Sequence, residues 1–169
     1  VVDNDSKDAS KETILGEFPF VVWHEMGYNA GFARANNAGI RMAHGDTILL
    51  LNPDTLILKD ALQKTLQLFL NSKHVACGVQ MLHPNLNTQI SGSNFMKGGL
   101  NHLLPLPYWG QFLKWVAGWL KLQKPSIEVA HSEEEVDWIS GAFLMVKKQV
   151  IEKAGLMDED FFLYAEEVE

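Results

Sequence analysis

Three groups of acidic residues are placed where they could bind a cation or accept a proton. Asp54 follows Pro53 and the apolar run TILLL (47–51). One or two carboxylates together with substrate phosphates are the usual protein ligands of Mg²⁺, so this position suits a metal site. It equally suits a turn residue or a helix N-cap, because a helical pattern follows. Spacing alone leaves these interpretations open.

The other two groups lie near the ends of the chain. The stretch from Asp3 to Asp8 could supply an acceptor for a base or ribose, although Asn, Asp and Ser also favour turns by bonding their own backbone. Glu166 and Glu167 come among aromatic residues near the last position. A positioned carboxylate there could act as a general base, and adjacent acids are also common at exposed helix starts.

The segment NAGFARANNAGI (29–40) combines flexible backbone with a side chain suited to phosphate. Gly31 permits close approach of a ligand to the main chain. Arg34 is one of only two arginines, and its planar donor group matches phosphate oxygens. Gly39 falls inside a predicted helix, where it costs roughly 1 kcal/mol relative to alanine, and this indicates tight packing. No P-loop, zinc-ligand or serine-hydrolase motif occurs.

The composition is that of a globular protein, with 47% hydrophobic and 21% charged residues among 169. The net charge of −7 argues against a nucleic-acid partner. The single cysteine, Cys77, excludes an intrachain disulfide, favours a reducing compartment, and is predicted to lie in the core. The chain contains no apolar run of 18 residues that would predict a membrane-spanning helix.

Apolar periodicity predicts alternating strands and helices in the first half of the chain. The predicted strands are 1–3, 20–23, 47–51 and 75–82, and the predicted helices are 8–17, 31–43 and 59–71. Such alternation favours an α/β fold with a mostly parallel sheet covered by helices. Ligands of these sheets bind beyond the carboxyl ends of the strands, where Asp3 and Asp54 are expected.

The second half begins with turn signals at 83–85 and 91–93 and continues into an aromatic segment, 100–122. An amphipathic helix is predicted at 108–122; it would either pack on the rest of the protein or lie at a membrane interface. Residues 136–146 are predicted to form a strand, a turn around Gly141 and a second strand. A short helix, 147–154, then ends at Gly155.

Five segments, in this order, resemble the family-two glycosyltransferases, particularly their bacterial rhamnosyltransferase-like branch. They are VVDNDSKD (1–8), NAGFARANNAGI (29–40), GDTILLLNPDT (45–55), VDWISGAFLMVKK (136–148) and GLMDEDFFLYAEEVE (155–169). The resemblance implies a GT-A fold: a Rossmann-like mixed sheet flanked by helices. It implies one domain over 1–169, with a nucleotide-sugar-binding half, 1–82, and an acceptor-binding half, 83–169. We expect an excerpt that lacks the family's first strand and its C-terminal helices.

The same resemblance assigns roles to individual residues. Asp3 would recognise the base of a nucleotide-diphosphate sugar. Asp54 would coordinate Mg²⁺ or Mn²⁺, with Asn52 at the partner position of the family's Asp-x-Asp motif. Trp138 and Gly141 would shape the acceptor side. The full set expected to bind the nucleotide sugar is Asp3, Asn4, Ser6, Asn29, Gly31, Phe32, Arg34, Asn37, Asn52 and Asp54.

Glu166 and Glu167 stand where the family has Glu-Asp, and the second acid, Glu167, is the expected catalytic base. The implied activity is inverting transfer of a sugar to a glycan or lipid-linked acceptor in bacterial cell-surface polysaccharide synthesis. The expected location is the cytoplasm, at the inner face of the membrane, with peripheral contact through 100–122. Two alternatives remain open: a sugar-nucleotide nucleotidyltransferase, and a catalytically degenerate module that binds a sugar nucleotide.

Overall fold

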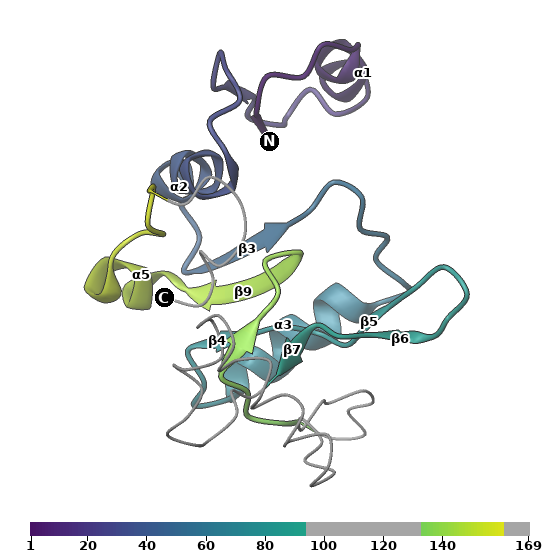
Figure 1. Ribbon diagram of the computed structural model, residues 1–169, viewed down its shortest axis with the longest axis vertical. Helices are drawn as coiled ribbons and strands as arrows, with labels where there is room; N and C mark the ends of the chain where they lie inside the picture. Colours follow the sequence, from purple (N-terminus) through teal and green to yellow (C-terminus); the bar gives the residue numbers. More distant parts are fainter. Residues whose placement is uncertain (94–132, 161–169) are drawn as a thin grey trace, which may run out of the picture. The chain divides into compact units, whose positions relative to one another are not determined.

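A computed structural model describes residues 1–93 and 133–160, which fall into two compact units (Figure 1). The first unit contains Val1–Val79 and the chain from Ser140 onward, and the second is Gln80–Ile139. The expected functional halves, 1–82 and 83–169, remain a prediction, and the compact units have other bounds. The reason is that the chain after Ile139 returns to pair with strands of the first unit.

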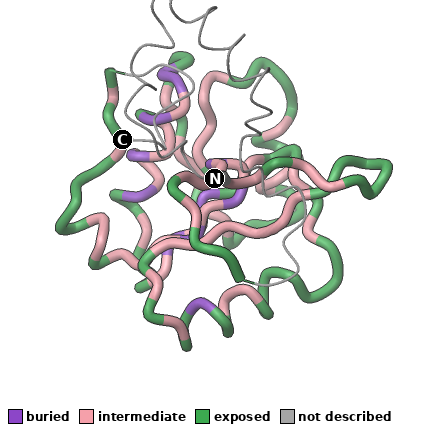
Figure 2. The backbone as a smooth tube through the Cα atoms, turned by 60° about the horizontal axis from the view of Figure 1, so that its bottom comes forward, coloured by how far each residue is buried: buried purple, intermediate pink, exposed green. Residues whose placement is uncertain are grey.

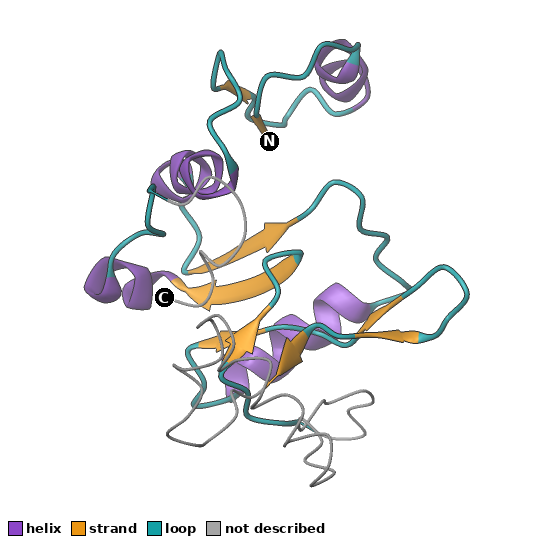
Figure 3. Cartoon of the chain, in the orientation of Figure 1, coloured by secondary structure: helices purple, strands orange, loops and turns teal. Residues whose placement is uncertain are grey.

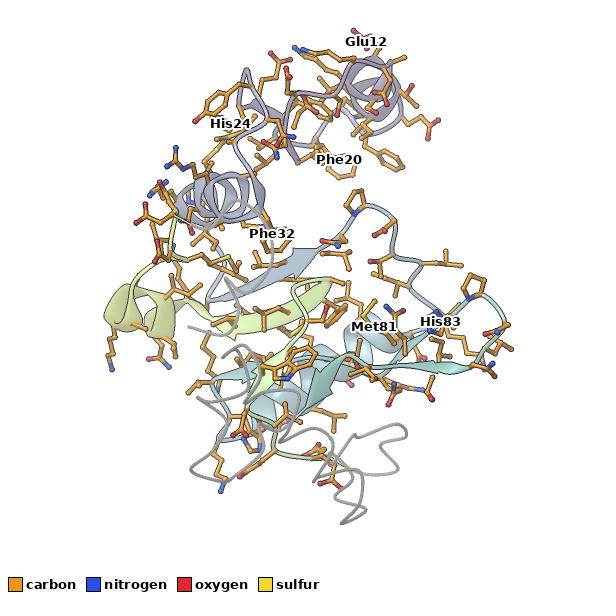
Figure 4. All side chains as sticks on the ribbon, viewed as in Figure 1. Glu12, Phe20, His24, Phe32, Met81 and His83 are labelled. Carbon is orange, nitrogen blue, oxygen red and sulfur yellow. The ribbon has the colours of Figure 1, made fainter. Side chains whose placement is uncertain are left out.

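The chain begins with a strand–helix–strand unit. It consists of β1 (Val2–Asp3), α1 (Ser10–Glu17) and β2 (His24–Glu25). The two strands pair in parallel, with Val2 opposite His24, as a helical crossover requires. Figure 4 labels His24 on the second strand of this pair.

The prediction of a strand at 20–23 is wrong by several residues. The N–H of Val21 donates to the carbonyl of Phe18 at 3.0 Å, which closes a turn around Pro19. Proline at the second position of a turn is favoured because its φ angle is fixed near the required value. The apolar run after Pro19 is therefore partly used in the turn, and pairing begins at His24.

A three-stranded sheet forms the centre of the first unit (Figure 3). Its strands, in spatial order, are β3 (Thr47–Leu51), β9 (Phe143–Lys147) and β4 (Ala76–Cys77). Strand β9 is antiparallel to both neighbours, so β3 and β4 run in the same direction. The expected mostly parallel sheet is thus mixed. Local alternation predicts parallel neighbours, but it cannot reveal a late strand inserted between them.

Helices cover both faces of this sheet, as the uninterrupted apolar run at 47–51 predicted. On one face, α2 (Phe32–Met42) and α5 (Lys148–Ala154) contribute Ile40 and Ile151 to a cluster with Ile48 and Leu50. On the other face, α3 (Ala61–Asn71) contributes Phe69 to a cluster with Phe143 and Met145. Figure 2 shows the fully buried positions as short stretches between half-buried and exposed backbone.

Helix α2 also packs closely against β1. A Cβ atom at Gly39 would lie 3.1 Å from Cγ2 of Val2, closer than almost all real Cβ contacts. Glycine in the middle of a helix weakens it, so its presence here is explained by the need for this short separation. The packing role predicted for Gly39 is confirmed.

The second unit contains two short antiparallel pairs. They are β5 (Met81–Leu82) with β6 (Thr88–Gln89), and β7 (Gly92–Ser93) with β8 (Trp138–Ile139). The predicted strand 75–82 is therefore divided between β4 and β5, with residues 78–80 lying between the two strands. The predicted turn at 83–85 is confirmed, since the N–H of Leu86 donates to the carbonyl of His83 at 2.8 Å; His83 is labelled in Figure 4.

The strand–turn–strand predicted around Gly141 and the helix ending at Gly155 are both confirmed. Gly155 has a φ of 102°, a conformation that favours glycine after a helix. The predicted helix 108–122, within the aromatic segment 100–122, lies outside the described residues. In the ranges that are described, every helix is too short or too polar to cross a membrane.

Replacement of Phe69 by alanine tests the core. The side chain is 2% exposed and packs on Phe143 and Met145, so Phe69→Ala should lower the free energy of unfolding by about 3–5 kcal/mol. The preceding residue, Leu68, is 61% exposed, and Leu68→Ala should change the free energy of unfolding by no more than about 0.5 kcal/mol. Denaturant unfolding of the full chain measures both, and equal effects would contradict the described packing.

Candidate functional site

The loop before α2 is held by one amide side chain from the end of β1. The Oδ1 atom of Asn4 accepts a hydrogen bond from the N–H of Ala30 at 2.8 Å. Its Nδ2 atom donates to Oδ1 of Asn29 at 3.1 Å and to the carbonyl of Gly31 at 3.3 Å. Asn4, Asn29 and Gly31, which were predicted separately to bind a nucleotide sugar, are therefore parts of one hydrogen-bonded loop.

Gly31 makes the turn from this loop into α2 possible. It is the N-cap residue with φ 82°, a left-handed conformation open to glycine and rarely to other residues. It provides no side-chain cap for the helix, which begins at Phe32 (Figure 4). Backbone N–H groups at an uncapped helix start, together with the helix dipole, form a favourable environment for an anion such as phosphate.

Asp3 and Ser6 form a turn after β1. The Oδ1 atom of Asp3 accepts a hydrogen bond from the N–H of Ser6 at 3.2 Å. Asp5 between them has φ 76°, and its carboxylate pairs with Lys7 at 2.6 Å. The half-buried Asp3 side chain is thus oriented by its own loop, with lone pairs left for a further donor.

Asn52 and Asp54 lie in a tight turn after β3. The carbonyl of Asn52 accepts a hydrogen bond from the N–H of Thr55 at 3.2 Å, with Pro53 and Asp54 as the two central residues. Helix α3 begins later, at Ala61 after Asp60, so Asp54 does not cap it. The turn interpretation of Asp54 is therefore correct and the helix-cap interpretation is wrong.

The same turn is joined to the strand–turn–strand segment around Gly141. The backbone N–H of Asn52 donates to the carbonyl of Ala142 at 3.0 Å, immediately after the last β3–β9 pair, Leu51 and Phe143. The end of β3 and the start of β9 therefore share one edge. Gly141 is buried at this edge.

The oxygen atoms of Asp54 and Asn52 could bind a divalent cation if phosphate oxygens completed its coordination. The Asp54 side chain is exposed, and over residues 1–93 and 133–160 no hydrogen bond or ion pair occupies its carboxylate. No group of three His, Cys, Asp or Glu side chains in those ranges could hold a metal by itself. Carboxylate and amide oxygens are suitable ligands for Mg²⁺ or Mn²⁺, and phosphate oxygens would have to complete the coordination.

A surface hollow of about 250 Å³ lies beside the loop held by Asn4. Two chain segments form its walls. Its lining residues are Tyr28, Asn29, Ala30, Arg34, Glu159 and Asp160. The hollow thus combines a guanidinium, an amide and an exposed aromatic ring, groups that can bind phosphate, hydroxyl and ring surfaces.

Glu159, one of the residues that line the hollow, is held by donors on α2. Its Oε1 atom accepts hydrogen bonds from Asn37 Nδ2 at 3.0 Å and from Arg41 Nη2 at 3.1 Å, while its carbonyl accepts one from Arg34 Nε at 3.2 Å. These donors favour the ionised carboxylate, so the hydrogen bond from Asn37, and then that from Arg41, hold the pKa of Glu159 below its ordinary value.

Asn37 itself is 0% exposed. Besides Glu159, it bonds the backbone of Met157 in both directions: Nδ2 donates to the carbonyl at 2.8 Å, and Oδ1 accepts from the N–H at 3.1 Å. Within the described residues, the Asn37 amide therefore joins α2 to the segment of Met157 and Glu159. Its expected contact with a nucleotide sugar remains a prediction.

The remaining expected site residues are the catalytic pair and the two residues of the acceptor side. Glu166 and Glu167, the expected catalytic pair, lie outside the described residues. Trp138 belongs to the second unit, where it pairs with Ser93, whereas Gly141 belongs to the first. The acceptor-binding role of Trp138 and Gly141 remains a prediction.

Sequence reasoning missed Glu159, Arg41, Asp160 and Tyr28. Glu159 is one of six carboxylates in the last segment, 155–169, and nothing in its spacing distinguishes it. A signal did exist on the helix: Arg34, Asn37 and Arg41 are spaced three and four residues apart and therefore share one face of α2. Two arginines around an amide on one face indicate an anionic partner.

The lowered pKa of Glu159 predicts an acid-sensitive contact. A group whose folded pKa lies below its unfolded value stabilises the fold above the unfolded pKa, and this is lost as the pH falls through the folded value. Glu159→Gln should therefore remove part of the loss of thermal stability seen as the pH falls below about 4.5. Melting temperatures between about pH 3 and pH 7 test this, and parallel curves for both proteins would contradict it.

Two curated glycosyltransferases are similar in sequence to this chain. The low-salt glycan biosynthesis hexosyltransferase Agl10 of Haloferax volcanii is 25% identical over 178 aligned residues, covering 100% of this chain and 50% of that protein. The rhamnosyltransferase WbbL of Escherichia coli K12 is 26% identical over 148 residues, covering 82% of this chain and 52% of WbbL. The chain thus spans about half the length of these curated relatives.

A solved structure has the same fold. The mannosyltransferase PcManGT of Pyrobaculum calidifontis, in complex with GDP-Man and Mn²⁺, matches 95% of this chain and 38% of its own, with a TM-score of 0.56 and 16% identity. The family model of glycosyl transferase family 2 matches residues 1–151. With its mixed sheet between helices, the chain has the GT-A fold and belongs to glycosyl transferase family 2.

Proposed function

We propose that this chain is the donor-binding core of an inverting glycosyltransferase that moves a hexose from a nucleotide-diphosphate sugar to an acceptor hydroxyl. The observation that carries the proposal is the loop Asn29–Gly31, held by Asn4 beside a hollow that contains Arg34, in a family-two chain. PcManGT was solved with a sugar nucleotide and Mn²⁺, which supports the same ligand class here.

In this proposal, different residues of the first unit bind different parts of the donor. Asp3, whose carboxylate is oriented by Ser6, binds the base or ribose. The uncapped start of α2 and Arg34 face phosphate oxygens. Asp54 and Asn52, in the turn after β3, hold Mg²⁺ or Mn²⁺ together with the diphosphate. The bound cation would offset the negative charge that develops on the leaving nucleoside diphosphate.

The proposed chemistry is a single displacement. The acceptor oxygen attacks the anomeric carbon as Glu167 takes its proton, and the bond from that carbon to the diphosphate oxygen breaks with its electron pair going to the nucleotide. Attack from the face opposite the leaving group inverts the anomeric centre. Residues 161–169, which include Glu167, lie outside the described part, so this role rests on the resemblance of 155–169 to the family.

The acceptor and the cellular setting belong to the same proposal. A glycan or lipid-linked acceptor in bacterial surface polysaccharide synthesis fits the rhamnosyltransferase WbbL, a curated relative of this chain. The aromatic segment 100–122 would make a peripheral contact at the inner face of the membrane. Membership of a glycosyltransferase family favours glycosyl transfer over the alternative of nucleotidyl transfer.

Donor binding can be tested without turnover. A nucleoside diphosphate (UDP, TDP or GDP) with Mn²⁺, at about 100 times its Kd, should stabilise the protein by about 2.7 kcal/mol and raise Tm by roughly 5–10 °C. Asp54→Ala should abolish the Mn²⁺-dependent part of this shift. Asp46→Ala is the matched control, because Asp46 is an exposed acid just before the other end of β3. An equal loss in both variants would contradict the assignment of Asp54.

The catalytic base is tested by two neighbouring amide substitutions in a longer protein that contains the relatives' full span. Glu167→Gln should lower the rate of transfer by about 10²–10⁴-fold and leave nucleotide affinity unchanged, since the base acts on the acceptor. Release of nucleoside diphosphate measures the rate. Glu166→Gln should retain more activity than Glu167→Gln; the reverse order would move the role of base to Glu166.

A further inference from the structure

One face of α2 is bonded to a segment that follows it by more than 110 residues. Arg34, Asn37 and Arg41 all donate to Glu159, which accepts through its side chain and its carbonyl. The sequence separations are 125, 122 and 118 residues. Contacts over such separations fix the position of the later segment on the helix.

Asn37 sets the register of this contact. Its amide bonds both polar backbone groups of Met157, as a neighbouring strand would, and also donates to Glu159. Because Asn37 is completely buried, an unsatisfied amide would be unfavourable, so the alignment of 157–159 that satisfies it is preferred. A shift of the segment by one residue would break these bonds together.

Two residues of this contact, Arg34 and Glu159, also line the hollow. Asp160 and the donor loop at Asn29 and Ala30 line it with them. Glu167 follows Glu159 by eight positions, and an extended chain covers at most about 28 Å over that length. The anchored segment is therefore the point from which the chain carrying the proposed base departs, beside the proposed donor site.

We propose that Asn37 and Glu159 are positioning residues of the transfer reaction, which hold the start of the acidic tail in register against the donor-binding helix. The inference rests on the proposed function. Neither residue touches the reacting atoms. Their effect is to fix where the proton acceptor stands relative to the anomeric carbon, a distance on which reaction rates depend steeply.

The test compares two substitutions of Glu159, whose side chain is 38% exposed and is therefore not required for the core. Glu159→Ala removes the acceptor of Asn37, and it should lower kcat about ten- to a hundredfold while the Kd for nucleoside diphosphate with Mn²⁺ changes less than about twofold. Glu159→Gln keeps an acceptor oxygen for Asn37 and should return kcat to within about threefold of the original protein.

Asn36→Ala is the matched control, because Asn36 is the adjacent amide and, among the described residues, its Nδ2 is bonded within α2, to the carbonyl of Phe32. It should leave kcat and Kd unchanged. Hydrogen exchange gives a readout independent of activity: Glu159→Ala should accelerate exchange of the Met157 N–H about tenfold, and Asn36→Ala should not.

The outcomes separate the two proposals. If the unsubstituted protein releases no nucleoside diphosphate from any donor, the proposed function fails, and the positioning role falls with it. If transfer occurs and Glu159→Ala lowers only Tm, or leaves both kcat and Met157 exchange unchanged, the positioning role alone is overturned. A loss of kcat that Glu159→Gln does not restore also overturns it, because the acceptor oxygen would then not be the cause.

Discussion

The pairing of β9 with β3 is the interaction on which the rest of the first unit depends. Five residue pairs, from Thr47–Lys147 to Leu51–Phe143, join β3 to a strand that comes much later in the sequence. Their alternation gives each helix a surface: Leu50 and Leu144 face α2 and α5, while Leu49 and Met145 face α3. The same pairing brings α5, and then the segment ending at Glu159, to the side of α2. The hollow is lined by residues from two distant parts of the chain, 28–34 and 159–160. The β3–β9 pairing brings these two parts together.

Elements with a strong apolar period could be predicted from the sequence, and those shaped by one local residue or by distant pairing could not. Helices α2, α3 and α5 and strand β3 begin and end within two residues of their predicted limits, because each has a continuous apolar face to bury. Strand β2 was misplaced since Pro19 closes a turn inside the apolar run. The antiparallel pairing of β9 with β3 joins residues at least 92 positions apart, as between Leu51 and Phe143, and local periodicity carries no information about such pairing.

The candidate site shows the same limit at the level of side chains. Residue type and loop position were enough to select Asn4, Asn29 and Gly31, but their mutual hydrogen bonds join positions 25 to 27 residues apart. Asn37 was selected as a ligand contact because of the motif around it, and the structure adds that it is buried and bonded to Met157 and Glu159. Glu159 went unnoticed because an acidic residue in an acidic segment has no distinctive pattern. The sequence thus identified polar groups in the loops, while the structure shows which of them are hydrogen-bonded to one another.

The bond from the N–H of Asn52 to the carbonyl of Ala142 joins main chain to main chain. Any residue except proline at position 52 can make it, so the side chains on both sides can change during evolution without breaking it. The turn proposed to face the donor and the segment proposed to face the acceptor would then keep their spacing while their chemical preferences diverge separately. A main-chain bond of this kind would allow one fold to accept different donors and different acceptors.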